Sequence, residues 1–463
     1  MTKIENRTFA ELKIGDSASL TRQLTPGDIT LFAVMSGDVN PAHVDAEYAK
    51  SDMFHEVIAH GMWGGTLIST VLGTELPGPG TIYLGQTFRF RHPVALGDTV
   101  TVTVKIAKKD DARHRVQLDC AVTNQKGEVV IDGSAEVIAP VEKISRERVE
   151  LPDVEMRSKG RHYHELLQRC AGLTPLRTAV VHPVDATSLL GAIAAAKAGL
   201  IEPILVGPEK KICAAAEAAG ADLSPYAIVS TEHSQAAAVK AAELACDRTV
   251  EALMKGSLHS DEFMHAIVCE PALRTDRRMS HVFVIDAPSY PRPLYVSDAA
   301  INIYPTLDDK RDIVQNAIDL AHALGLTEPK VAVLSAVETV SDKIKSTIDA
   351  AALCKMADRG QITGGIVDGP LAFDNAVSFE AAKTKGIVSP VAGQADVFIV
   401  PDLESGNMLD KQLEYLADAE MAGIVLGARV PVILTSRADK TMARLSSCAV
   451  ALLLARHKPG APA

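Results

Sequence analysis

The chain has 463 residues, which is too many for a single hydrophobic core, so two or three domains are expected. Apolar residues make up 47% of the sequence and charged residues 23%, as in ordinary soluble globular proteins. The formal net charge of −11 argues against a nucleic-acid-binding surface and gives no general attraction for anionic substrates. A site for a phosphate-bearing ligand must therefore gather its own Arg, Lys and backbone N–H groups.

The seven cysteines are scattered singly and form no CxxC pair, which indicates reduced thiols in a cytosol. The first residues, Met-Thr-Lys-Ile-Glu-Asn-Arg, are too charged for a signal peptide. Apolar runs such as residues 449–455 are far shorter than the roughly 20 residues that span a bilayer. We therefore expect a cytoplasmic protein with no membrane partner.

The first 140 residues have the pattern of an antiparallel sheet around one helix. Residues 98–106 alternate between apolar and polar side chains, residues 116–122 repeat the alternation, and residues 124–127 offer a hairpin turn into residues 128–137. The preceding segment 61–72 is apolar and rich in small residues, which predicts a helix buried nearly all round. A central helix wrapped by an antiparallel sheet is an α+β hot-dog domain, expected at residues 1–140.

Residues 141–161 are rich in Glu, Arg, Lys and Pro and are expected to be a linker. Beyond them, short apolar runs alternate with Ala-rich amphipathic segments such as 186–198 and 236–245. That alternation predicts a mainly parallel sheet with helices on both faces. Residues 162–463 are long enough for two α/β lobes around a cleft.

The most informative string in the first part is Ser-Gly-Asp-Val-Asn-Pro-Ala-His-Val-Asp at residues 36–45. Asp38 and His43, separated by a proline-fixed turn, can hold one water molecule that supplies both the base and the acid for adding water to a conjugated double bond. The N–H of Gly61, at the start of the predicted helix, can stabilise the enolate oxygen that develops. The alternative is that Asp38 only caps a turn and that His43 is a core residue.

Together with Ile-Ala-His-Gly-Met at residues 58–62, this string resembles the MaoC-like (R)-specific enoyl-CoA hydratases over about residues 15–140. The resemblance implies that Asp38 and His43 bind the catalytic water and that Gly61 donates to the thioester oxygen. A thioesterase of the same fold usually carries a carboxylate on the central helix. No Asp or Glu occurs between Gly61 and Leu72, so a hydratase is favoured.

Polar and Gly-rich strings follow the predicted strands of the second part, where α/β sheets bind ligands. Neither a Walker A loop nor a strand-linked GxGxxG is present, which argues against an NTPase or an ordinary Rossmann dehydrogenase. The strings resemble the phosphate acetyl/butyryltransferase family over about residues 160–460, and they begin at residues 254, 274, 297, 368, 401 and 434. The forms Asp-Gly-Pro-Leu and Pro-Asp-Leu-Glu-Ser-Gly-Asn lean toward the butyryl branch.

This resemblance implies catalytic roles for Ser436 and Arg437, which bind phosphate and steady the oxyanion. It leaves Asp439 as the nearest carboxylate, because the position of the acetyl branch's aspartate holds Met442 or Ala443. The candidates for binding CoA or phosphate are Lys255, Gly256, Ser257, Arg274, Asp298, Asp368 and Asn407.

The sequence thus predicts a bifunctional enzyme that uses CoA thioesters and phosphate as substrates, with no permanently bound cofactor and no metal. Pairing of hot-dog units predicts a homo-oligomer. Two alternatives stay open for the second part. One is a catalytically inactive CoA-binding regulator, and the other is a domain like the decarboxylating dehydrogenases, for which Asp298, Asp368 and Asp374 would form a metal cluster.

Overall fold

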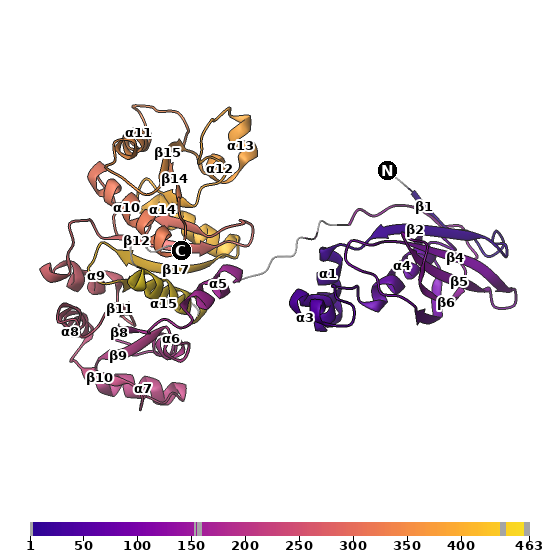
Figure 1. Cartoon of the computed structure of the whole chain (residues 1–463), viewed down its shortest axis with the longest axis horizontal. Helices are drawn as coiled ribbons and strands as arrows, with labels where there is room; N and C mark the ends of the chain where they lie inside the picture. Colours follow the sequence, from indigo (N-terminus) through magenta and orange to yellow (C-terminus); the bar gives the residue numbers. More distant parts are fainter. Residues whose placement is uncertain (1–2, 152–153, 155–159, 436–440, 458–463) are drawn as a thin grey trace. The chain divides into compact units, whose positions relative to one another are not determined.

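The computed structural model describes residues 3–151, 154, 160–435 and 441–457 and divides the chain into two compact units, Met1–Met156 and Arg157–Ala463 (Figure 1). Each unit has its own hydrophobic core. No helix in the described part of the chain is both long and apolar enough to cross a membrane.

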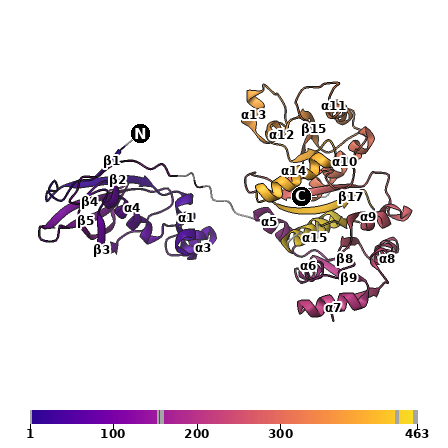
Figure 2. The ribbon, with the colours of Figure 1, turned by 180° about the vertical axis from the view of Figure 1, so that it is seen from behind.

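The first unit contains a curved antiparallel sheet and one long helix. Its elements are β1 (Lys3–Glu5), β2 (Ser17–Gln23), α1 (Pro26–Ser36), α2 (Pro41–Val44), α3 (Ala46–Ser51), α4 (Gly61–Thr74), β3 (Ile82–Phe90), β4 (Thr99–Asp110), β5 (Arg115–Asn124), β6 (Val129–Ile138) and β7 (Ser145–Glu147). The order of the main sheet is β2-β4-β5-β6-β3, and α4 contacts β4 and β2 on one face of it (Figure 2). The hot-dog architecture is confirmed.

The alternating burial expected of the first unit's strands is present. Val100, Val102 and Val104 on β4 are fully buried, while the threonines between them are partly exposed. The helix α4 is less enclosed than expected: it buries Trp63, Leu67 and Val71 along one broad face, but Met62 is exposed. The sheet covers only that face, so the opposite face of the helix remains open.

The boundary of the first unit lies beyond the one expected at residue 140. The strand β7, inside the segment expected to be a linker, pairs antiparallel with β1. Asn6 holds this segment in place, because its side chain donates to the Glu142 carbonyl at 2.7 Å and accepts from the Ile144 N–H at 2.9 Å. The charged, proline-containing composition of residues 141–161 predicted a linker, and it did not indicate that β7 pairs with β1.

The first unit's sheet is open, and β3 forms one of its two edges. Among the described residues, β3 pairs with β6 alone, and Ile82, Leu84 and Phe90 on it are exposed. An apolar open edge of this kind suits pairing with a second copy. The homo-oligomer expected from the sequence stays a prediction.

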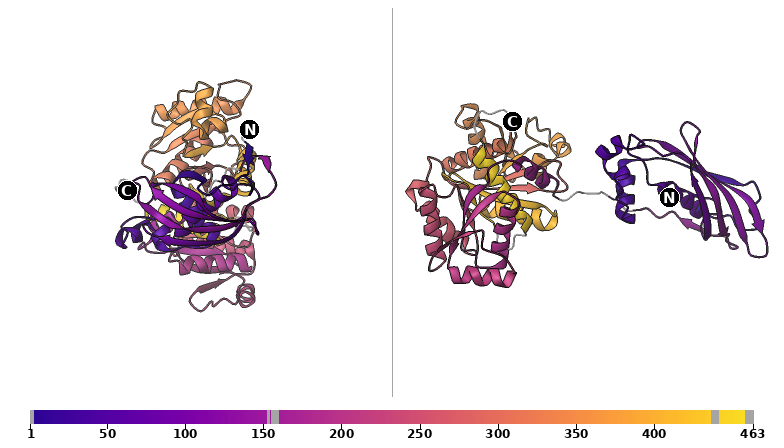
Figure 3. Two further views of the ribbon diagram at one scale, coloured as in Figure 1. Left: turned by 90° about the vertical axis from the view of Figure 1, so that its right-hand side faces the viewer. Right: turned by 60° about the horizontal axis from the view of Figure 1, so that its bottom comes forward.

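The second unit is a layered α/β structure built on one large sheet (Figure 3). Its helices are α5 (Arg161–Cys170), α6 (Ala186–Lys197), α7 (Glu209–Ala219), α8 (Ser234–Cys246), α9 (Ser260–Val268), η1 (Pro271–Leu273), α10 (Leu307–Ala323), α11 (Lys345–Asp358), α12 (Phe373–Val377), α13 (Phe379–Thr384), α14 (Leu403–Leu416) and α15 (Thr441–Arg456). Its strands are β8 (Leu176–Val181), β9 (Ile201–Gly207), β10 (Ala227–Ser230), β11 (Ala252–Lys255), β12 (Ser280–Asp286), β13 (Leu294–Ser297), β14 (Lys330–Leu334), β15 (Ile366–Leu371), β16 (Val397–Ile399), β17 (Glu420–Leu426) and β18 (Val432–Ile433).

The eleven strands follow the order β10-β9-β8-β11-β18-β17-β12-β13-β16-β14-β15. The strands β8 to β11 with β18 are parallel to one another, and so are β13 to β16. Between the two groups, β17 is antiparallel to both β18 and β12, and β12 is antiparallel to β13. The mainly parallel sheet is confirmed, but its two parallel groups run in opposite directions.

Candidate active sites

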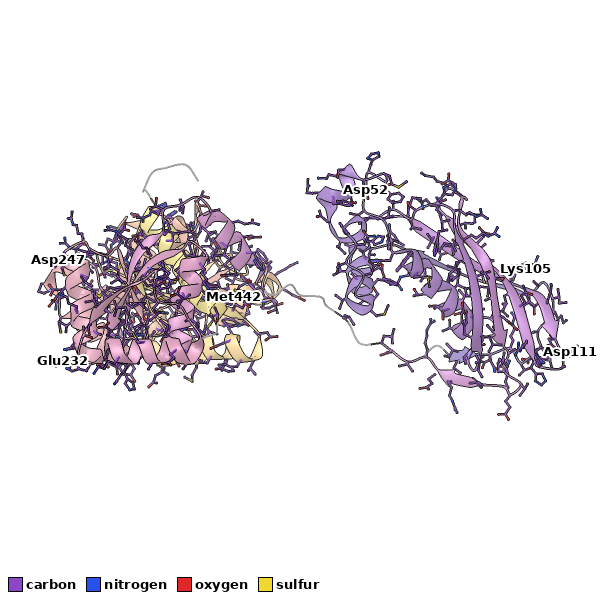
Figure 4. The ribbon with its side chains drawn as sticks, turned by 90° about the horizontal axis from the view of Figure 1, so that it is seen from below. Asp52, Lys105, Asp111, Glu232, Asp247 and Met442 are labelled. Atoms are coloured by element: carbon purple, nitrogen blue, oxygen red, sulfur yellow. The ribbon has the colours of Figure 1, made fainter. Side chains whose placement is uncertain are left out.

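The candidate site of the first unit lies where α1 ends and α2 begins. Gly37 ends α1 with a positive φ of 77°, a conformation that favours glycine, and the chain then passes through Asp38. Asn40 caps α2 by accepting from the Ala42 N–H at 3.2 Å, which carries His43 on the short helix. In Figure 4, Asp52 beside α3 and Asp111 in the β4–β5 turn mark opposite ends of this unit, and the site is at the α3 end.

Asp38 and His43 face the same point. One ligand atom from each of Asp38, His43 and His60 lies within 4.8 Å of the other two. A water molecule that makes two ordinary hydrogen bonds spans up to about 5.6 Å, so Asp38 and His43 can share one water. The Nδ1 atom of His43 is 2.9 Å from the Ile58 carbonyl oxygen and must donate to it, which leaves Nε2 as the acceptor of the neutral ring.

A cavity of about 290 Å³ opens beside this pair, and His43, His60 and Gly61 are among its lining residues. Asp38 is exposed and lies outside that lining. Gly61 is the first residue of α4, and a side chain on it would approach the Phe90 ring to 3.1 Å, so glycine keeps the space above the helix N-terminus open. The N-terminal N–H groups of a helix suit a developing negative charge.

Sequence reasoning gave no role to His60, although it belongs to the string that carried the resemblance. His60 is buried and precedes α4, and its ring contacts that of His43 at a centroid distance of 4.1 Å, tilted by 36°. The ligand atoms of Asp38, His43 and His60 are close enough to hold an ion, so the absence of a metal expected from the sequence stays a prediction.

In the second unit, the predicted Lys-Gly-Ser loop lies at the end of β11. Lys255 is only 3% exposed, and its Nζ donates to the Thr435 carbonyl at 3.3 Å. A side chain on Gly256 would meet the Val181 carbonyl oxygen at 2.3 Å, so only glycine fits there. Ser257 donates its backbone N–H to the His182 carbonyl at 2.9 Å. Ser436, Arg437 and Asp439 lie outside the described residues.

Two charged residues beside this loop were not found from the sequence. Arg444, on α15, is 2% exposed, and its Nη1 donates to Thr435 Oγ1 at 3.0 Å. Asp185 caps α6 by accepting from the Ser188 N–H at 2.8 Å. Burial raises the pKa of Asp185, but hydrogen bonds from Ser257 and Ser188 and the Arg444 guanidinium outweigh burial and lower it. The ends of β11 and β18 thus share a buried cluster of charges.

The other predicted ligand-binding residues are not part of this cluster. Asp298, after β13, is 3% exposed, and its carboxylate accepts from the N–H groups of Ala300 and Ile301 at 2.9 and 3.0 Å. Asn407, on α14, is exposed and donates to the Ala299 carbonyl at 3.5 Å. Asp298 and Asn407 therefore lie on adjoining segments, and the Asp298 carboxylate mainly shapes its own turn.

Arg274 and Asp368 are separate from both groups. Arg274 is exposed, and its Nε donates to the Val268 carbonyl at the end of α9 at 2.7 Å. Asp368 is partly buried on β15, the last strand of the sheet. Asp298 follows the carboxyl end of β13, which runs opposite to β11 and β18, so this strand end points away from the end of β11 at Lys255. Asp368 lies within β15 and not at its carboxyl end. The assignment of these residues to one phosphate-binding cleft stays a prediction.

Comparison with known proteins agrees with the division into two units. The family described as Phosphate acetyl/butaryl transferase matches residues 231–452, and the family described as MaoC like domain matches residues 11–127. A phosphate acetyltransferase of Rickettsia prowazekii is 58% identical over 304 residues, which are 65% of this chain and 87% of that protein.

Two solved structures are similar to the separate units. A branched-chain phosphotransacylase from Enterococcus faecalis is 27% identical, with a TM-score of 0.54, and the match covers 61% of this chain and 100% of that one. An R-hydratase from Pseudomonas aeruginosa is 48% identical, with a TM-score of 0.33, and the match covers 34% of this chain and 99% of that one.

Proposed function

The chain belongs to the phosphate acetyl/butyryl transferase family and carries a MaoC-like domain as well, and from this we propose that it combines two activities on CoA thioesters. The second unit transfers an acyl group between CoA and phosphate. The first unit adds water to trans-2-enoyl-CoA and forms (R)-3-hydroxyacyl-CoA. Membership of the transferase family favours acyl transfer over the dehydrogenase alternative.

The hydration follows from one water molecule held by Asp38 and His43. The free Nε2 of His43 accepts a proton as the water oxygen attacks the β-carbon, and the proton needed at the α-carbon is delivered from the same pair. The negative charge that develops on the thioester oxygen is directed to the N-terminus of α4 at Gly61. The observation that carries the proposal is the common point that Asp38 and His43 face, beside the cavity that Gly61 lines.

The acyl transfer exchanges a thioester bond for an acyl-phosphate bond. A phosphate oxygen attacks the thioester carbonyl, the carbon–sulfur bond breaks, and the CoA thiolate leaves; the reverse reaction consumes acyl phosphate. The buried cations Lys255 and Arg444 both donate to Thr435, the residue that precedes Ser436 and Arg437 in the sequence, and this supports anion binding there. We propose an acetyl or butyryl group as the acyl part, the two named in the family's description.

The experiment is to assay both activities on the full chain and on two single variants. Asp38→Asn and His43→Gln are each expected to lower hydration of crotonyl-CoA by about 10²–10⁴-fold, the usual contribution of a positioned acid or base. Arsenolysis of acetyl-CoA and butyryl-CoA, which reports the transferase, is expected to be unchanged in both. Near-normal hydration by either variant would contradict the water-holding role.

The unmodified chain also tests the inactive-regulator alternative for the second unit. Turnover of acetyl-CoA or butyryl-CoA in the arsenolysis assay supports the transferase, and the ratio of the two rates reports the preferred acyl length. If neither CoA ester is turned over while CoA binding persists, the second unit is a CoA-binding regulator.

A further inference from the structure

His60 links the two segments that carry the proposed hydratase residues. Its Nε2 atom lies 3.0 Å from the backbone carbonyl oxygen of Asp38, which is 22 residues earlier in the chain. A carbonyl oxygen only accepts, so Nε2 carries the proton and donates. The His60 ring also lies between two others, at centroid distances of 4.8 Å from Phe32 and 4.1 Å from His43.

The link is reciprocal. His60 donates to the carbonyl of Asp38, in the segment that carries His43, while His43 donates through Nδ1 to the carbonyl of Ile58, in the segment that carries His60. Each imidazole thus fixes the main chain beside the other. The Nδ1 atom of His60 is buried and has no hydrogen-bond partner in the described part of the chain, so the tautomer with its proton on Nε2 fits this environment.

Asp38 has few other restraints. It is exposed, its own N–H donates to Ser36 Oγ at 3.2 Å, and its Oδ1 accepts from the Asn40 N–H at 3.2 Å. Both of these bonds lie within the same turn and cannot fix the turn against α4. Within the described part of the chain, the bond from His60 ties Asp38 to the segment leading into α4.

We propose that His60 is a positioning residue, whose Nε2–H holds the Asp38 main chain so that the carboxylate shares its water with His43. The inference rests on the proposed hydratase function of the first unit. A displacement of about 1 Å in a catalytic group can cost on the order of 10² in rate, so losing this restraint affects the chemical step more than the binding of CoA.

Two variants separate the hydrogen bond from the ring. His60→Phe keeps a ring against His43 and Phe32 but removes the donor, and we expect it to lower kcat for crotonyl-CoA by about 10–100-fold with little change in KM. His60→Gln places an amide N–H near the position of Nε2 and is expected to recover most of that loss. Phe32→Leu, which removes a stacking partner and keeps the donor, serves as the matched control and is expected to retain near-normal kcat.

The outcomes distinguish this inference from the proposed function. If Asp38→Asn abolishes hydration while His60→Phe keeps the wild-type kcat, the positioning role is wrong and the hydratase proposal stands. An unchanged kcat with a raised KM also overturns it, because His60 would then only line the substrate cavity. If His60→Phe fails to fold, His60→Gln decides: a folded variant with near-normal kcat supports the proposal, and one that has lost hydration contradicts it.

Discussion

The two candidate sites hold their charged groups in opposite surroundings. In the first unit, the Asp38 carboxylate is exposed, and the Asp38 main-chain carbonyl accepts a hydrogen bond from the His60 side chain at 3.0 Å. In the second unit, Lys255 and Arg444 are almost completely buried, and both donate to Thr435. A buried charge that loses a partner destabilises the fold, whereas an exposed carboxylate does not. Substitution of Asp38 should therefore affect catalysis alone, whereas substitution of Lys255 or Arg444 should affect both catalysis and stability.

The largest expected effect in the second unit comes from Lys255→Met. Met has a similar length but cannot donate to the Thr435 carbonyl, and it removes the buried ammonium group of Lys255. We expect arsenolysis of the preferred acyl-CoA to fall by about 10²-fold or more, the scale of losing one oxyanion-stabilising donor. Hydration of crotonyl-CoA should be unchanged.

The control for Lys255→Met is Lys240→Met in the same unit. Lys240 forms an ion pair with Glu243 at 2.8 Å on the exposed face of α8, where such pairs contribute about 0–1 kcal/mol. It should leave both activities and the melting temperature unchanged. Normal arsenolysis by Lys255→Met would show that the buried lysine is structural only.

The first site was predictable from sequence because it is local. Asp38, His43 and Gly61 lie within one short stretch, and a proline-fixed turn and a helix start were enough to bring them together. The strand β7 was missed because its pairing with β1 depends on side-chain contacts of Asn6, which no periodicity reports. The reciprocal role of His60 also needed coordinates, since its partner is a backbone carbonyl.

The second site was predictable in its elements and not in its arrangement. The apolar runs at residues 178–181, 204–206, 281–285, 331–334, 397–400 and 432–434 predicted strands, and they overlap β8, β9, β12, β14, β16 and β18. Their directions could not be predicted, because the two antiparallel strands β12 and β17 reverse the sheet between the parallel groups. Lys255 and Asp298 therefore look alike in the sequence, because each stands at the end of a strand, but their strands β11 and β13 run in opposite directions. Arg444 was missed because a buried arginine in an apolar helix has no sequence signature.

Asp410, on α14 of the second unit, is a buried acidic residue, in contrast to the exposed Asp38 of the first unit. Neither of its oxygens has a hydrogen-bond partner in the described part of the chain. Burial raises the pKa of Asp410 to about 8. The positive charge of Lys411 lowers this pKa, whereas the negative charges of Asp298 and Glu414 raise it further. The folded state therefore keeps this proton to a higher pH than the unfolded chain, whose aspartates titrate near about 4. The free energy of unfolding therefore falls as the pH rises from about 4, the pKa in the unfolded chain, to about 8, the pKa in the folded state. Above pH 8 the effect of Asp410 on the free energy of unfolding is constant.

Asp410→Asn keeps the shape of the side chain and cannot ionise. Scanning calorimetry between pH 5 and 8 should show the melting temperature of the second unit falling less steeply with pH in the variant. At pH 8 we expect the variant to melt at least about 3 °C higher, on a scale of about 2–4 °C per kcal/mol for domains of this order of size. The first unit's transition should not shift. Identical slopes in the two proteins would show that Asp410 is ionised in the folded state.

The smallest expected effect compares one helix cap in each unit. Asn40→Ala removes the acceptor for the Ala42 N–H at the start of α2, and Thr306→Ala removes the capping box that Thr306 forms with Asp309 at the start of α10. Each change should destabilise its own unit by about 0.5–2 kcal/mol, seen as a shift of one calorimetric transition. Only Asn40→Ala should also slow hydration of crotonyl-CoA, because α2 carries His43, whereas α10 carries none of the residues proposed for acyl transfer. If both variants lose the same stability but only Asn40→Ala hydrates crotonyl-CoA more slowly, the first site depends on the placement of the short helix α2. If Asn40→Ala hydrates at the normal rate, the hydrogen bond from His43 to the Ile58 carbonyl is sufficient to position His43 without the cap.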